Sequence, residues 1–159
     1  MSEATDEDAR WMLRALEEAR VAALRGEVPV GCVLVDPARG EEVASGHNLR
    51  ELLQDPMAHA EVEAMRVAAR RRGSWRLDGL TAYVTLEPCA MCAGAFVNAR
   101  ITRVVYGCDD PRAGALRSLY RLGEDTRLNH RYAVVPGVMA EACAAELRRF
   151  FRALRARGG

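Results

Sequence analysis

The chain has 159 residues, of which 50% are hydrophobic and 28% are charged, and its formal net charge at pH 7 is +1. This length and apolar content suit one folded domain with a full hydrophobic core and exclude a disordered chain. No apolar run approaches the ~20 residues of a membrane span, and the acidic N-terminus lacks the positive start of a signal peptide.

The predicted elements alternate between helices and strands. A helix is expected at residues 5–25, where Thr5 and Asp8 form a capping box and Gly26 stops the helix. Strands are expected at 28–35 and 42–45 around a turn at 37–40, followed by a loop at 46–57. The remaining elements are a helix at 59–72, a strand at 81–86, a helix at 89–99 with Pro88 in its first turn, strands at 103–107 and 132–136, and a helix at 139–157.

This order predicts an α/β fold with a mixed central sheet of about five strands and helices on both faces. The chain shows no internal repeat and no linker, so one domain is expected over residues 1–159, with flexible ends at about 1–5 and 156–159. Two of the five cysteines lie in a C-x-x-C motif, and a reducing cytoplasm is the expected location. All 23 basic residues are arginine, which genomic base composition explains without any nucleic-acid ligand.

Two short motifs carry the chemistry of the chain. The first is His59-Ala60-Glu61, and the second is Pro88-Cys89-Ala90-Met91-Cys92. One imidazole and two thiolates make three zinc ligands, which leaves one tetrahedral position for water, as in catalytic zinc sites. The sequence therefore predicts one zinc ion held by His59, Cys89 and Cys92.

Glu61 lies two residues from the predicted histidine ligand, where a carboxylate near the metal but not on it can shuttle protons. As a lone residue it would be interpreted as a solvated helix position. A C-x-x-C motif alone could also be a redox pair or half of a structural zinc site. The other cysteines are expected in the core, and His47 and His130 in loops.

The order H-x-E…P-C-x-x-C is typical of zinc nucleobase deaminases. The chain closely resembles the bacterial tRNA-specific adenosine deaminase family of the cytidine deaminase-like superfamily. The resemblance extends from about residue 11 to 155 and lies in GEVPVG at 26–31, DPMAHAE at 55–61, TLEPCAMCAGA at 85–95, RVVYG at 103–107, NHR at 129–131 and FFR at 150–152. The chain departs from the family pattern at Met57 and in the segments 49–54 and 107–118.

This resemblance implies a three-layer α/β/α cytidine deaminase-like fold and hydrolytic deamination of adenosine 34 in a tRNA anticodon stem-loop. It also implies a homodimer with one zinc ion per subunit and an RNA site built from both subunits. Asn48 would hydrogen-bond the flipped nucleoside, and the backbone of Ala60 would grip the purine. The full expected substrate-binding set is Asn48, Ala60, Val30, Pro88, Asp110, Arg112, Arg149, Phe151 and Arg152.

Two alternatives remain open at this point. A free nucleobase or nucleoside deaminase of the guanine or cytosine type would share the zinc chemistry, but would not need an arginine-rich last helix. A non-catalytic, zinc-stabilised RNA-binding module would not need Glu61. Arginines beside Phe150 and Phe151 suit an unpaired RNA loop, although a solvated amphipathic helix has the same composition.

Overall fold

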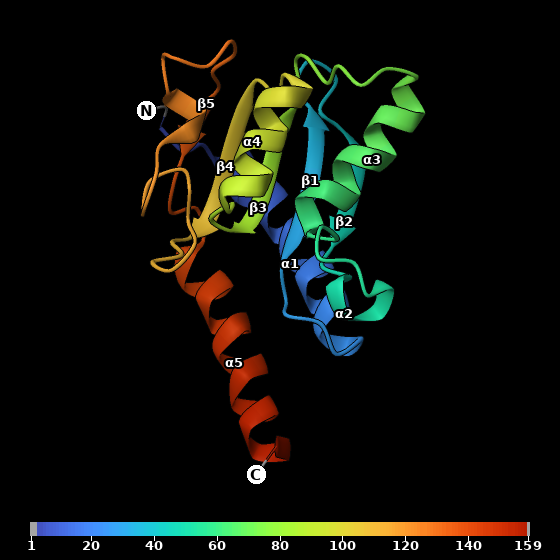
Figure 1. The fold of residues 1–159 in the computed structure, drawn as a ribbon, viewed down its shortest axis with the longest axis vertical. Coiled ribbons are helices and arrows are strands. Elements are labelled where there is room, and N and C mark those ends of the chain that lie inside the picture. The colour runs from blue at the N-terminus through green and yellow to red at the C-terminus, as the bar shows by residue number, and fades with distance from the viewer. Residues whose placement is uncertain (1–2, 159) are drawn as a thin grey trace.

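The structure is a computed structural model that describes residues 3–158 (Figure 1). Its centre is a five-stranded mixed sheet in the order β2-β1-β3-β4-β5. β1 pairs antiparallel with both β2 and β3, whereas β3, β4 and β5 are parallel. The strands are β1 (Gly31–Asp36), β2 (Glu41–His47), β3 (Thr81–Leu86), β4 (Arg103–Cys108) and β5 (Ala133–Val135).

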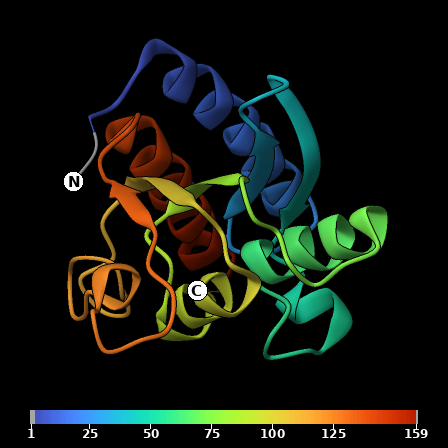
Figure 2. The same ribbon diagram turned by 90° about the horizontal axis from the view of Figure 1, so that it is seen from above.

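Helices cover both faces of this sheet (Figure 2). α1 (Asp6–Leu24) and α5 (Ala140–Gly158) lie on one face, and α3 (Ala60–Arg72) and α4 (Ala90–Ala99) lie on the other. Each face has its own core of buried side chains, one centred on Phe96 and Tyr106 and the other on Met12 and Leu16. The predicted α/β class and the three-layer arrangement are confirmed.

Several helix boundaries follow from local sequence. Thr5 and Asp8 form the predicted capping box at the start of α1, and Gly26 follows the last turn with a left-handed backbone. Gly73 ends α3 in the same way. Gly46 of β2 allows α3 to lie directly on the sheet, because a Cβ there would come within 2.7 Å of the Ala60 carbonyl oxygen.

Four expectations about the elements around the site were wrong. β1 begins at Gly31 rather than at Val28, because residues 28–30 lie outside the paired strand and the Val30 N–H bonds the Val28 carbonyl oxygen at 2.9 Å in a tight turn. β2 extends to His47, and the expected loop contains a short helix, α2 (Arg50–Leu53). Pro88 lies outside α4, since Cys89 is the residue that caps this helix.

The C-terminal helix α5 extends beyond the sheet, so that its last turns project from the body (Figure 1). Residues 156–158, which were expected at a flexible end, continue this helix, and residues 1, 2 and 159 of the expected ends lie outside the described residues. Among residues 3–158, no helix combines the length and apolarity that crossing a membrane requires.

Candidate metal centre and substrate pocket

The helix starts of α3 and α4 bring three metal-binding side chains together. His59 caps α3, Cys89 caps α4 and Cys92 lies in the first turn of α4. The Nδ1 atom of His59 lies 3.6 Å from the sulfur of Cys89 and 3.5 Å from that of Cys92. The three ligand atoms all lie within 4.8 Å of one another.

These distances fit a tetrahedral zinc ion. Zinc bonds of about 2.3 Å to sulfur and about 2.05 Å to nitrogen, at a tetrahedral angle, separate the two ligand atoms by about 3.6 Å. His59 makes no capping hydrogen bond with α3, so its ring is free to face the thiols. The donor set of one imidazole and two thiols is also one that zinc prefers. The three side chains therefore form a candidate metal site.

The local electrostatics favour a thiolate at this site. A hydrogen bond from the Cys92 thiol, with a second from His59, lowers the pKa of Cys89 to about 4. The hydrogen bond to Cys89 in turn raises the pKa of His59. Cys89 is therefore ionised at neutral pH, which is the form that binds metals.

Glu61 is buried beside the ligand cluster, with only 3% of its surface exposed. Burial raises the pKa of this carboxyl group, because a low-dielectric environment disfavours its charged form. Glu61 reaches a pocket of about 130 Å³. This pocket is lined by Val28, Val30, Asn48, Arg50, His59, Ala60 and Glu61.

The pocket contains three of the expected substrate-binding residues, Val30, Asn48 and Ala60, and two that the sequence did not suggest, Val28 and Arg50. The Asn48 amide donates to the Val28 carbonyl oxygen at 3.3 Å and accepts from the Arg50 N–H at 3.1 Å. Asn48 thus shapes the pocket wall and holds the turn that follows β2. No local pattern could have indicated Arg50, which falls in a segment expected as loop.

Pro88 is buried but is not a lining residue of this pocket. Its carbonyl oxygen accepts a 2.8 Å hydrogen bond from the backbone N–H of Ala115. Pro88 thereby connects the metal-binding segment to the loop that follows β4.

Two buried carboxylates hold the loops around the site, and sequence analysis did not identify either. Glu27 accepts from the backbone N–H groups of Glu51 at 3.0 Å and Leu52 at 2.7 Å, which caps α2. Glu87 accepts from four backbone N–H groups and one hydroxyl of the 110–118 loop. Although burial opposes ionisation, the hydrogen bonds from Ser118 and its neighbours lower the pKa of Glu87.

A second, larger hollow of about 670 Å³ lies between the 110–118 loop and α5. We call it the arginine groove. It brings together four of the expected RNA-binding residues, Asp110, Arg112, Phe151 and Arg152. Its lining is Asp110, Arg112, Leu147, Arg148, Phe151, Arg152 and Arg155.

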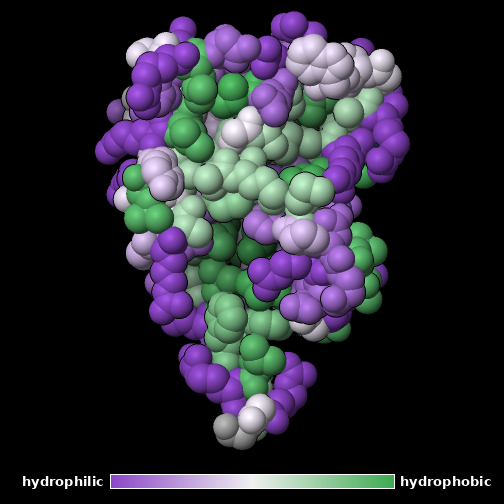
Figure 3. Space-filling model, in the orientation of Figure 1, coloured by the Kyte–Doolittle hydropathy of each residue, from purple (hydrophilic) through white to green (hydrophobic). Residues whose placement is uncertain are grey.

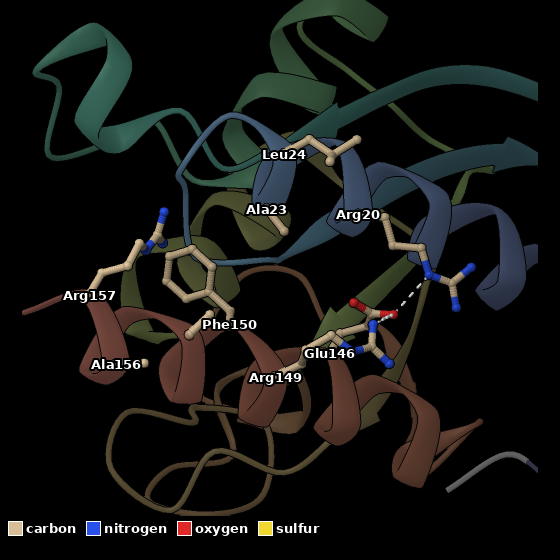
Figure 4. Close-up of a pocket in the computed structure, with 9 residues that line it drawn as sticks. Arg20, Ala23, Leu24, Glu146, Arg149, Phe150, Ala156 and Arg157 are labelled. Atoms are coloured by element: carbon tan, nitrogen blue, oxygen red, sulfur yellow. Dashed lines mark hydrogen bonds and ion pairs between the residues drawn. The ribbon is translucent and has the colours of Figure 1, made fainter.

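Arg149 is separated from this groove. It lies on the face of α5 toward α1, where its guanidinium pairs with Glu146 at 2.9 Å (Figure 4). Glu146 also pairs with Arg20 of α1 at 2.9 Å. The structure therefore places Arg149 in a contact between two helices, away from the other expected RNA-binding residues.

The remaining cysteines and histidines lie outside the metal cluster. Cys32, Cys108 and Cys143 are buried, as expected for core residues. His130 lies in a loop and its Nε2 is 2.7 Å from the Ile101 carbonyl oxygen. His47 lies on β2 rather than in a loop, with its Nδ1 3.2 Å from a carboxylate oxygen of Glu18.

Known proteins share both the site motifs and the fold. Residues 5–108 match the family model described as the cytidine and deoxycytidylate deaminase zinc-binding region. The chain is 48% identical over 149 residues to the tRNA-specific adenosine deaminase of Bacillus subtilis (strain 168), covering 94% of this chain and 91% of that protein.

Two solved structures extend the comparison. One, from a study of A-to-I editing by tRNA:A34 deaminases, superposes with a TM-score of 0.82 at 42% identity, covering 87% of this chain and 99% of that one. A guanine deaminase from Nitrosomonas europaea superposes with a TM-score of 0.77 at 21% identity, covering 92% and 85%, which shows a shared fold alone. The chain therefore belongs to the cytidine and deoxycytidylate deaminase family and, within it, to the tRNA-specific adenosine deaminases.

Proposed function

We propose that this chain is a single deaminase domain that converts adenosine to inosine at the wobble position, 34, of a tRNA anticodon. The observation that carries the proposal is the buried Glu61 beside the cluster of His59, Cys89 and Cys92. The tRNA substrate is supported by the similarity to tRNA-specific adenosine deaminases along 94% of the chain. Such an enzyme would act in the cytoplasm, where tRNA is found.

His59, Cys89 and Cys92 would hold one zinc ion per subunit. A zinc ion bound there supplies Lewis acidity and lowers the pKa of its water to about 7. The low pKa of Cys89 supplies a thiolate ligand at neutral pH. Because both ligand helices begin at the site, the three side chains are held by rigid backbone.

Glu61 would move the protons of the reaction. It takes a proton from the attacking water and delivers it to the ring nitrogen beside the carbon under attack. Glu61 then takes the remaining proton of the added hydroxyl and passes it to the amino group, so that ammonia leaves and the carbonyl of inosine forms. The raised pKa of the buried carboxyl suits this role, since Glu61 must both accept and release a proton near neutral pH.

The small pocket and the arginine groove together suit an RNA loop. A pocket of about 130 Å³ accommodates little more than one flipped base. The groove offers Arg112, Arg152 and Arg155 for phosphates and the partly exposed ring of Phe151 for stacking. With a net charge of only +1, the chain depends on such a local patch for RNA affinity.

The outer face of α4 supports a homodimer. Met91, Gly94 and Ala95 lie on this face, and a Cβ at Gly94 would meet open space. An apolar area covers the middle of the same side of the molecule (Figure 3). Small residues let a partner helix approach closely, so we propose that this face is the dimer interface. Light scattering should give a dimer for the wild type and a monomer for Gly94→Arg.

The free-nucleobase deaminase is the alternative function, because its zinc chemistry would be the same. One experiment separates the two. The purified protein is incubated with an anticodon stem-loop bearing A34, and separately with guanine, cytosine and adenosine. Inosine in the stem-loop supports the proposal. Ammonia released only from the free compounds would instead support the free-nucleobase deaminase.

A further inference from the structure

Arg50 is the one arginine among the residues that line the small pocket. It is exposed, whereas Ala60 and Glu61 in the same pocket are 0% and 3% exposed. Arg50 therefore lies at the mouth of the pocket, and the base of a substrate would pass it on the way to Glu61.

Two buried side chains hold the backbone at this position. The Asn48 side chain accepts a 3.1 Å hydrogen bond from the Arg50 N–H. Glu27 accepts from the next two N–H groups, those of Glu51 and Leu52. The Asn48 bond closes a local turn, and the two Glu27 bonds come from a segment 24 and 25 positions away, so the backbone at Arg50 is fixed although its side chain is exposed.

The charge of Arg50 acts through space on His59, where it opposes the rise in the pKa of that ring. Across the described part of the chain, residues 3–158, its guanidinium forms no ion pair and no side-chain hydrogen bond. Many other arginines of the same surface are paired, as Arg66 is with Asp55 and Glu63. A guanidinium at the mouth of a pocket is thus available to an anionic group of the ligand.

The size of the pocket indicates which group that is. Pockets for whole drug-sized ligands measure about 300–1,000 Å³, so a pocket of about 130 Å³ holds a base and leaves the sugar and its phosphates at the mouth. We propose that Arg50 binds a phosphate that flanks the flipped nucleotide and so determines specificity for a nucleotide within a chain over a free base. This proposal rests on the proposed function.

The test pairs a change in the protein with a change in the RNA. All proteins carry Glu61→Ala, which blocks turnover, and binding to an A34 stem-loop is measured by fluorescence anisotropy. The RNA carries normal phosphates, or one neutral methylphosphonate on the 5′ or the 3′ side of A34. We expect Arg50→Gln to weaken binding of normal RNA by about tenfold and to lower the salt slope by about 0.7.

With the methylphosphonate at the contacted position, Arg50→Gln should cause no further loss, because the interaction is already absent. Arg50→Lys should keep the salt slope and lose part of the affinity. Arg70→Gln is the matched control, since Arg70 is exposed near the far end of α3. This variant should bind the stem-loop as tightly as the protein with Arg70 and Arg50 intact. An equal loss for Arg50→Gln on all three RNAs, or no loss on any, overturns the inference.

If the proposed function itself were wrong, the results would differ from those that overturn the Arg50 inference. In that case the protein with Arg50 intact would show no specific binding of the stem-loop, and the protein with Glu61 intact would form no inosine.

Discussion

Ser118 donates two hydrogen bonds to the buried carboxylate of Glu87, one from its hydroxyl at 2.5 Å and one from its backbone N–H at 2.9 Å. Glu87 is only 2% exposed and lies two residues before Cys89. A Cβ at Gly114 would come within 2.4 Å of the same carboxylate. The 110–118 loop is therefore wrapped around one side chain of the metal-binding segment.

Glu87→Gln should destabilise the protein by about 2–4 kcal/mol, because the new amide group turns a donor toward the N–H groups of the loop. The melting temperature should fall by roughly 5–10 °C, and hydrogen exchange should accelerate in residues 110–118. Ser118→Ala removes only the hydroxyl contact and should cost about 1 kcal/mol. Unchanged exchange in this loop would contradict the anchoring role of Glu87.

Cys92→Ala should abolish zinc binding, since two protein ligands are left of three. Metal analysis of the purified variant should give far less than the one zinc per chain expected of the wild type. Stability should fall as well, because metal binding is coupled to folding. Cys143→Ala is the control: Cys143 is equally buried but lies in the other core, so this variant should retain its zinc.

Glu61→Ala should keep its fold and its zinc but lose deamination. General acid–base groups contribute about 10²–10⁴-fold to a rate, and Glu61 serves more than one proton transfer, so a loss of about 10⁴-fold or more is expected. The measurement is the single-turnover rate of inosine formation. A variant that kept a tenth of the wild-type rate would refute the proton-shuttle assignment.

The arginine groove predicts different roles for neighbouring arginines. Replacing Arg152 and Arg155 together by Ala should weaken stem-loop binding and reduce the salt slope by about 0.7 for each lost phosphate contact. Arg149→Ala should leave RNA binding unchanged, because this side chain pairs with Glu146 on the other face of α5. Equal effects of the two variants would argue against the groove as the RNA site.

Asp8 predicts how stability depends on pH. Despite burial, hydrogen bonds from Arg103, Thr5 and Tyr83 lower its pKa from 3.8 to about 2. A group with a depressed pKa stabilises the fold above its unfolded pKa and loses this contribution as the pH falls through the folded value. Asp8 should therefore contribute about 2 kcal/mol above pH ~4, lost between pH ~4 and ~2. In denaturant unfolding, Asp8→Asn should have a lower free energy of unfolding than the wild type at pH 7, and this difference should shrink as the pH falls over the same range.

Local sequence was sufficient to predict the helix limits that depend on adjacent residues. The capping box of α1 and the glycine stops of α1 and α3 are examples, since the interacting groups lie within a few residues of one another. The ligand set of His59, Cys89 and Cys92 could be proposed because few residue types bind zinc. The class of fold followed from the alternation of helical and strand patterns.

Contacts between distant segments could not be predicted in this way. Glu27 caps α2 from 24 positions away along the chain, so residues 50–53 carry no local sign of a helix. Likewise, Glu87 reaches Ser118 across 31 positions. A buried carboxylate looks like any other glutamate in the sequence until the fold brings its donors to it.

The last helix, α5, also combines a feature that local sequence predicts with contacts that it does not predict. Helical periodicity places Arg148, Arg152 and Arg155 on one stripe of α5 and Arg149, Ala153 and Ala156 on another. Residue spacing alone is enough to define these two stripes, and residue type alone is enough to define the chemistry of the metal ligands. The neighbour of each stripe depends on how α5 packs against the sheet, so it took the fold to show that the first stripe meets the 110–118 loop and the second meets α1.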